Sequence, residues 1–258
     1  MSSSRLPVGS FVATAKEQMQ TVIDRLGELG YRTVGPQVAD GAIIYDEIDS
    51  VAQLCRGVLD VQDGGLYQLK EDGDAGWFDH AAGPHSLKNY VFPPRETLLE
   101  AERHEGGWQM RQASAAVDPV AVIGVRSCDL HALEIQDRVF LKGPYVDPTY
   151  QARREALFLC AVNCRRAGAT CFCHSMKSGP AVKSRFDLLF TELDDCFIVE
   201  VGSQQGGQVI AATEWAPCRM DQVQQARQQP RKLAEQMASR PAQSGREPQP
   251  RSLDTTDI

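Results

Sequence analysis

The 258-residue chain lacks the patterns that would place it in a membrane, outside the cell or on nucleic acid. Its longest apolar runs, Val120–Val125 and Ala156–Val162, are far shorter than the roughly 20 residues of a membrane-spanning helix. The first thirty residues contain no long apolar segment, so we expect no signal peptide and a cytoplasmic location. The net charge is −7 and basic blocks are missing, so we expect no nucleic-acid partner.

Nucleotide-binding and hydrolase motifs are also missing. The chain contains neither a G-x-x-x-x-G-K-[ST] loop nor a G-x-S-x-G elbow, which argues against a P-loop protein and an α/β-hydrolase. The glycines of Gly202–Gly207 have the wrong spacing for a dinucleotide-binding loop. No catalytic residue is therefore predicted from a motif, and the sequence leaves open whether the protein is an enzyme.

The first half of the chain predicts a mixed, mainly antiparallel region. Apolar residues recur at helical spacing from Thr14 to Leu29, where Thr14 can cap a helix and Gly30 can end it. Asp-Gly steps then separate short strand-like segments, which is typical of hairpins. A short helix is predicted over Arg95–Leu99, after two prolines. The predicted strands are Tyr31–Val34, Ala42–Tyr45, Leu66–Leu69 and Tyr90–Phe92.

The second half predicts a parallel α/β unit. Val120–Val125 and Leu157–Val162 are continuous apolar runs, as expected for strands buried on both faces. Helices are predicted from about Ser127 to Phe140 and over Pro148–Ala156, and further elements over Phe186–Phe190 and Phe197–Val201. The fold class is therefore mixed α/β (α+β). We expect residues 1–217 to fold either as one domain or as two parts, 1–115 and 116–217.

Two segments are predicted to be polar and solvated. Glu192, Asp194 and Asp195 are expected to form an acidic turn on the surface. Residues 218–258 are rich in Gln and Pro and have few large apolar side chains, so they can bury little surface. We expect an isolated polar helix over 221–238 and a linker over 239–251.

The cysteines are the most informative feature. Of the eight, Cys164, Cys171 and Cys173 lie on one loop after a predicted strand, and Cys128 follows another predicted strand and opens a helix. If the two strands are parallel neighbours, all four sulfurs meet at one edge of the sheet. The amide dipoles of the helix would favour a thiolate at Cys128. The remaining cysteines are expected to be small buried hydrophobes: Cys55, Cys160, Cys196 and Cys218.

Four thiolates suit either a [4Fe–4S] cluster or a structural zinc ion. Structural zinc usually has paired C-x2-4-C knuckles, and the C-x6-C-x-C spacing of Cys164, Cys171 and Cys173 is irregular for it. A cubane tolerates that spacing better, so the cluster is favoured. Redox-active thiols at Cys171 and Cys173 are a third alternative. His174 could be a zinc ligand but is expected to be a bystander.

Residues around the cysteines could support such a cluster. Gly168 and Gly179 could let backbone N–H groups approach the sulfurs. Three arginines could offset the negative charge of the cluster, and such neighbours tune its potential. The alternative is that these arginines belong to the solvated surface: Arg126, Arg165 and Arg166.

Several segments together resemble the beta subunit of cytoplasmic sulfhydrogenase-type NiFe hydrogenases and the related A subunit of anaerobic sulfite reductase. The likeness extends over most of residues 20–215. It rests on Val122–Asp129, Asp147–Arg154 and Cys171–Met176 with Gly179 and Pro180, and also on Phe92–Leu98, Phe186–Leu189 and Val199–Ser203.

The resemblance implies an electron-transfer subunit without a substrate site of its own. Such subunits relay electrons between a flavin subunit that uses NAD(P) and a hydrogenase or sulfite reductase catalytic subunit. Cys128, Cys164, Cys171 and Cys173 stand at the cysteine positions of the matching motifs. Family members continue into a ferredoxin-like domain with two C-x2-C-x2-C-x3-C runs, and this sequence contains none. Since Leu253–Ile258 resembles the segment before that domain, we expect a truncated chain.

Overall fold

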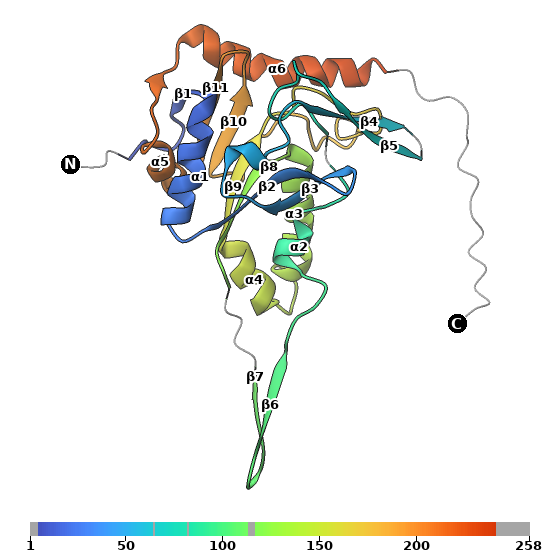
Figure 1. Cartoon of the computed structure of the whole chain (residues 1–258), viewed down its shortest axis with the longest axis vertical. Helices are drawn as coiled ribbons and strands as arrows, with labels where there is room; N and C mark the ends of the chain where they lie inside the picture. The colour runs from blue at the N-terminus through green and yellow to red at the C-terminus, as the bar shows by residue number, and fades with distance from the viewer. Residues whose placement is uncertain (1–4, 64, 82, 113–116, 241–258) are drawn as a thin grey trace.

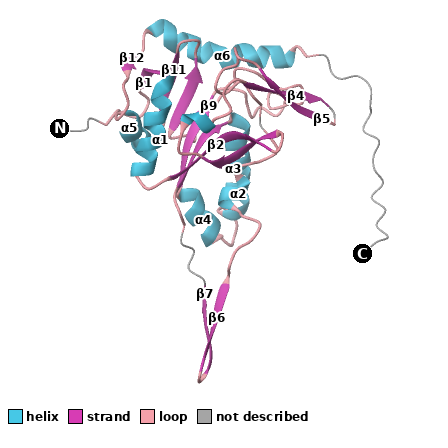
Figure 2. Cartoon of the chain, viewed as in Figure 1, coloured by secondary structure: helices cyan, strands magenta, loops and turns pink. Residues whose placement is uncertain are grey.

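The computed structural model describes residues 5–63, 65–81, 83–112 and 117–240. Its centre is an eight-stranded mixed sheet, with helices on both faces (Figures 1 and 2). Along the sheet the strands are β12 (Ala216–Pro217), β1 (Phe11–Ala15), β11 (Cys196–Val201), β10 (Leu188–Glu192), β9 (Leu157–Val162), β8 (Val120–Val125), β2 (Arg32–Ala39) and β3 (Ala42–Glu47). This architecture confirms the mixed α/β class.

The middle of the sheet is parallel and its flanks are antiparallel. β2, β8, β9 and β10 are parallel neighbours, whereas β3, β11, β1 and β12 join in antiparallel pairs. Strands from both halves of the chain therefore share one sheet. Two further hairpins stand outside it: β4 (Val58–Asp63) with β5 (Leu66–Glu71), and β6 (Leu99–His104) with β7 (Gly107–Gln112).

Helices cover the sheet on both faces, and the central strands β8 and β10 are buried along their whole length. One core packs α1 (Met19–Glu28) and α5 (Gln204–Ile210) against one face, and the other packs α2 (Lys88–Val91), α3 (Ser127–Phe140) and α4 (Pro148–Glu155) against the opposite face. Because alternate side chains of a strand point to opposite faces, Ile123 enters the first core and Val122 the second. Short 3-10 turns cover Lys16–Gln18 and Val51–Gln53.

Several predicted boundaries in the first half are wrong. The first helix begins at Met19, because Thr14 belongs to β1, where it pairs with Phe197. The predicted strand Tyr90–Phe92 lies mostly in the short helix α2, whose Val91 is fully buried. The predicted helix Arg95–Leu99 does not form. This short segment leads instead into β6, and a helix of four or five exposed residues has too few bonds to be stable.

The polar C-terminal helix is not isolated. Helix α6 (Met220–Ala238) buries Ala226, Pro230, Leu233 and Met237, which recur at helical spacing and form an apolar stripe. Ala226 packs against Ile198 of β11 in a third core. The predicted linker 239–251 lies almost entirely outside the described residues.

The predicted acidic turn is also wrong for one of its members. Glu192 ends β10 with only 2% of its surface exposed, and its carboxylate accepts hydrogen bonds from the backbone N–H groups of Trp77 and Phe78. It also forms an ion pair of 2.9 Å with Lys16. A buried carboxylate needs such partners, and Asp194, with a side chain 96% exposed, does not have the same environment.

The β6–β7 hairpin extends away from the rest of the molecule (Figure 1). All six residues of β6 are exposed, and so are Trp108 and Met110 of β7. In the part of the chain that the structure describes, no helix is long and apolar enough to cross a membrane.

Candidate metal centre

The carboxyl ends of β8 and β9 bring the predicted site together. The two strands are adjacent and parallel, with Ile123 opposite Cys160, as the sequence predicted. Arg126 caps the following helix, so Cys128 lies in the first turn of α3. Cys164 comes two residues after the end of β9. The two cysteines therefore leave the sheet at the same edge, where α/β proteins place their sites.

All four predicted cysteines line one cavity of about 300 Å³. Cys128 comes from α3, Cys164 from the end of β9, and Cys171 and Cys173 from the loop that follows. On the same measure, a single water needs only about 10–15 Å³, so the space is large enough for a polyatomic group. His174 is not among the residues that the structure places around this cavity.

The four thiols share the lining of one cavity. Among the described residues, no group of three or more His, Cys, Asp or Glu side chains is arranged to hold a single metal ion. The structure thus brings the predicted ligands to one cavity, and their role as ligands stays a prediction.

Burial and mutual repulsion favour the protonated thiols. Burial, followed by Asp129, Cys164 and Cys173, raises the pKa of Cys128 well above its usual range. Burial and then the Cys164 and Cys171 thiols raise the pKa of Cys173 to about 11. The pKa of Cys128 thus moves in the opposite direction to the thiolate that its place at the helix N-terminus was expected to favour. A metal group would have to displace these protons in order to bind.

One buried cation lies beside the cysteines. Arg126 is 2% exposed, and its Nη2 donates to the carbonyl oxygens of Phe78 at 3.0 Å and His80 at 2.9 Å. Its Nη1 donates to Cys164 Sγ at 3.8 Å. Burial alone would lower the pKa of the Arg126 guanidinium, but Cys164 and other neighbours outweigh burial and raise it. Arg126 therefore stays charged.

The charge of Arg126 lacks an ion-pair partner. Among the described residues, no carboxylate lies within 4 Å of its guanidinium, and Asp129 instead accepts a hydrogen bond from its backbone N–H. Buried charges are normally paired or bound to a metal group. The cavity beside Arg126 is thus suited to an occupant that carries negative charge.

The other two arginines are compensated. Arg166 lines the cavity but pairs with the fully buried Asp60 at 3.1 Å. Arg165 pairs with Asp79 at 3.2 Å and with Glu192 at 3.6 Å, and it is not among the residues around the cavity. Arg165 and Arg166 are therefore ion-paired, and neither is the solvated surface residue that the alternative interpretation expected.

Segments distant in the sequence form the walls of the cavity. On one side, Thr170 of the cysteine loop hydrogen-bonds Gln62 of β4. On the other, Arg240, just after α6, donates to the carbonyl oxygens of Ala167 at 2.8 Å and Gly168 at 2.7 Å. The loop is therefore held between the β4–β5 hairpin and the end of α6. No sequence motif predicts that either element forms a wall of the cavity.

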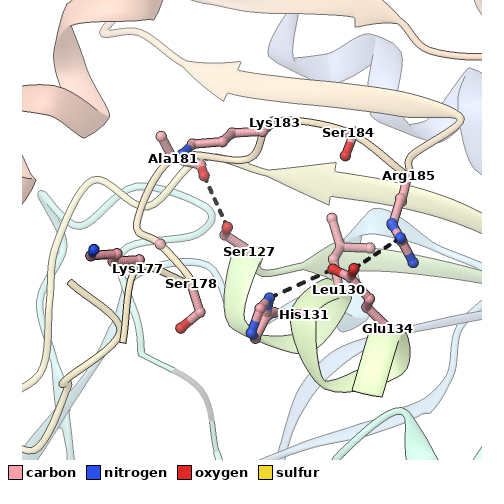
Figure 3. A pocket seen from close by; sticks show the side chains of 11 residues that line it. Ser127, Leu130, His131, Glu134, Lys177, Ser178, Ala181, Lys183, Ser184 and Arg185 are labelled. Atoms are coloured by element: carbon pink, nitrogen blue, oxygen red, sulfur yellow. Dashed lines mark hydrogen bonds and ion pairs between the residues drawn. The ribbon is translucent and has the colours of Figure 1, made fainter. Parts of the chain in front are cut away.

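The loop after Cys173 is fixed to α3. Ser127 Oγ donates to the Ala181 carbonyl oxygen at 2.9 Å, and Arg185 pairs with Glu134 at 3.1 Å (Figure 3). These contacts border a smaller polar pocket of about 130 Å³. They hold the segment that carries Cys173 against the helix that carries Cys128.

Gly179 lies unusually close to one of the thiols. A Cβ at this position would be 3.0 Å from Cys173 Sγ, a separation that forces something to move. At Gly168, the other glycine considered from the sequence, a Cβ would meet Ala81 at 3.2 Å and Asp60 at 3.3 Å. A side chain at either position would therefore push a neighbour by a few tenths of an ångström, and of the two only Gly179 lies this close to a sulfur.

The other cysteines stay outside the cavity. Cys160 is fully buried in β9 and Cys196 packs in the small core beneath α6, with Cys218 partly buried beside it. Cys55 is buried too, but its Sγ lies 3.4 Å from His80 Nδ1. The sequence did not indicate this pair.

One curated relative is similar to this chain. It is the protein named sulfhydrogenase 2 subunit beta from Pyrococcus furiosus, 26% identical over 203 residues. The match covers 78% of this chain and 51% of the relative, so the chain spans about half the length of the protein it matches. No family model and no solved structure matches the chain.

Proposed function

We propose that this protein is an electron-transfer subunit that holds one [4Fe–4S] cluster through Cys128, Cys164, Cys171 and Cys173. The observation that carries the proposal is their shared cavity, which Arg126 also borders. Four cysteine thiolates, one for each iron atom, are the ligand set that [4Fe–4S] proteins commonly use. The charge of such a group matches the cation that borders the cavity.

The size of the cavity favours a cluster over a zinc ion. Tetrahedral zinc requires four ligand atoms about 2.3 Å from one point when they are thiolates. The four cysteines line a cavity of about 300 Å³, which is more space than one zinc ion needs. A cluster spreads its ligands over several metal atoms, so it suits a wider arrangement.

The protein residues would each have a separate role at such a centre. The four thiolates would bind the iron atoms, and Arg126 would offset part of their negative charge. The β4–β5 hairpin and α6 would restrict solvent, because Gln62 and Met237 border the cavity from these two elements. The cluster itself would supply the capacity to accept and release one electron.

We further propose that the protein works within a hydrogenase-type oxidoreductase complex in the cytoplasm. The relative is named as a subunit of a sulfhydrogenase, which is a multi-subunit enzyme. The partners would be a flavin-containing, NAD(P)-binding subunit and a catalytic subunit of the hydrogenase or sulfite reductase type. In this assembly, residues 1–217 would supply the four cysteines, and α6 would form one wall of their cavity.

Anaerobic reconstitution with iron and sulfide tests the proposal. We expect about four irons per chain, broad visible absorption, and an electron paramagnetic resonance signal after reduction. Cys128→Ser should lose most of the iron and the signal. Cys218→Ser is the matched control, because Cys218 is partly buried but lies outside the cavity, and it should reconstitute like the wild type.

Other results would favour the two alternatives. A colourless protein with one tightly bound zinc per chain would indicate a zinc-stabilised docking module. A protein without metal that cycles a disulfide between Cys171 and Cys173, unaffected by Cys128→Ser, would indicate a dithiol redox protein. Either result would contradict the cluster.

A further inference from the structure

The three arginines near the cysteines differ in what neutralises them. Arg165 and Arg166 each have carboxylate partners within 4 Å, as described above. Among the described residues, the Arg126 guanidinium donates to two carbonyl oxygens and one sulfur, and Asp129 attracts it without forming an ion pair within 4 Å. Of these three cations, Arg126 is therefore the one whose positive charge is least neutralised by carboxylates and can best attract an occupant of the cavity.

The position of Arg126 is fixed by the fold. Its backbone caps α3, its side chain is buried, and its Nη2 is held by the backbone carbonyls of Phe78 and His80. The guanidinium also lies over the Phe78 ring, 6.0 Å from the centroid. A cation held in this way cannot swing into solvent when the charge in the cavity changes.

We propose that Arg126 is a positioning residue that sets the reduction equilibrium of the centre by stabilising its reduced state through Cys164. The inference rests on the proposed function. Reduction adds one electron from a donor subunit and makes the cluster one charge more negative. No covalent bond to Arg126 forms or breaks, and its guanidinium keeps all its protons.

The physical reason is the low polarity around Arg126. A fixed positive charge attracts the more negative oxidation state more strongly, and burial weakens the screening by water. Hydrogen bonds to cluster sulfurs and solvent exposure are known levers on the potential of iron–sulfur centres. Arg126 combines a charge with a hydrogen bond to Cys164 Sγ, which links it to one defined ligand.

The test measures the midpoint potential of the reconstituted full chain. Arg126→Gln removes the charge and keeps a hydrogen-bond donor, while Arg126→Lys keeps the charge. We expect Arg126→Gln to disfavour reduction at least tenfold, which is a 59 mV shift for one electron. Arg126→Lys should stay within threefold of the wild type.

Arg185→Gln is the matched control. It removes a cation that pairs with Glu134 and Asp137 of the same helix but does not line the cavity. Its potential should stay within threefold of the wild type, because carboxylates already compensate Arg185. A shift as large as that of Arg126→Gln would contradict a specific role for Arg126.

The remaining outcomes are also decisive. An unchanged potential in Arg126→Gln, or equal shifts in the Gln and Lys variants, would overturn the proposal, because charge would then not be the cause. If Arg126→Gln binds no iron while Arg126→Lys does, the charge serves to hold the centre rather than to set its reduction equilibrium, and the proposal is overturned. If both variants lose iron, Arg126 acts through its shape and the proposal fails. A wild-type protein without iron would instead contradict the proposed function itself.

Discussion

Asp60 of β4 and Arg166 of the cysteine loop form an ion pair of 3.1 Å, although 106 residues separate them in the sequence. Asp60 is fully buried, and its Oδ1 also accepts a hydrogen bond from the Ala81 N–H at 2.5 Å. Arg166 donates in addition to the Asp60 carbonyl oxygen. This carboxylate therefore joins three segments around the candidate metal centre.

We expect Asp60→Ala to destabilise the protein by about 2–3 kcal/mol. The variant leaves the Ala81 N–H without its acceptor and Arg166 without its carboxylate. Breaking a fully buried pair costs about 3–5 kcal/mol, and the loss is smaller here because about a third of the Arg166 side chain is exposed. Urea unfolding of the purified variant measures the difference.

The control for Asp60 is an exposed ion pair. Glu28→Ala removes the partner of Arg25 on α1, where the Glu28 side chain is 64% exposed. Surface pairs contribute about 0–1 kcal/mol, so this change should be small. Equal effects of Asp60→Ala and Glu28→Ala would mean that the Asp60 network does not stabilise the fold.

Gly179→Ala should impair metal loading more than folding. The new Cβ would lie 3.0 Å from Cys173 Sγ and 3.4 Å from Ser127 Cβ, so the thiol or the loop has to move. We expect iron incorporation to fall severalfold while the midpoint of thermal unfolding changes by only a few degrees. Gly73→Ala is the control, since no atom lies within 4 Å of its added Cβ. Wild-type iron incorporation in Gly179→Ala would show that metal binding does not depend on the present position of Cys173.

The buried parallel strands and their cysteines were predictable from the sequence, because continuous apolar runs report burial on both faces. Val120–Val125 and Leu157–Val162 have the predicted bounds, and they bring Cys128 and Cys164 to one edge as expected. The cysteine loop then follows from the positions of Cys171 and Cys173. This part of the site depends on local pattern and on a simple rule of sheet topology.

The walls of the site were not predictable, because they depend on long-range contacts. Nothing in the sequence around Asp60 indicates that it pairs with Arg166. Glu192 is followed by two further acidic residues, a pattern that resembles a surface turn. Helix α6 resembled a solvated segment because its apolar stripe is narrow: Ala226, Leu233 and Met237 are enough to bury it against the body. Tertiary packing decided each of these cases.

The neutral form of buried His80 should make stability depend on pH. Burial, then Arg126 and Arg166, lowers the pKa of His80 well below its usual value of about 6.5. Below pH 6.5 the unfolded chain binds a proton that the folded protein does not, so stability falls as the pH falls. The slope from His80 should be about 1.4 kcal/mol per pH unit until its folded pKa is reached.

Comparison with His80→Gln isolates this contribution. The other titrating groups are common to both proteins, so their effects cancel in the difference of unfolding free energy. Between pH 7.5 and 5.5, the wild type should lose about 1 kcal/mol more than the variant. If the unfolding free energies of the wild type and His80→Gln change equally over this range, His80 has the same pKa in the folded and the unfolded protein.

The β6–β7 hairpin should contribute little to the stability of the rest of the protein. Its side chains are exposed, and a two-stranded hairpin alone is only marginally stable in water. Leu99 pairs with Gln112, so their Cα atoms are about 5 Å apart and a four-residue Gly-Ser linker can replace the hairpin. We expect the thermal midpoint of this variant to stay within about 2 °C of the wild type, because few buried contacts are lost.

Limited proteolysis gives an independent measurement on the intact chain. Local opening is easiest where few apolar contacts are buried, so within residues 5–239 the first cuts by trypsin should fall near Arg103 and Arg111. Arg126 is the internal comparison, since its burial should protect it until the whole protein unfolds. Cleavage after Arg126 before any cut in the hairpin would reverse the expected order. The resistance of the hairpin would then mean that something other than the described residues covers it in solution.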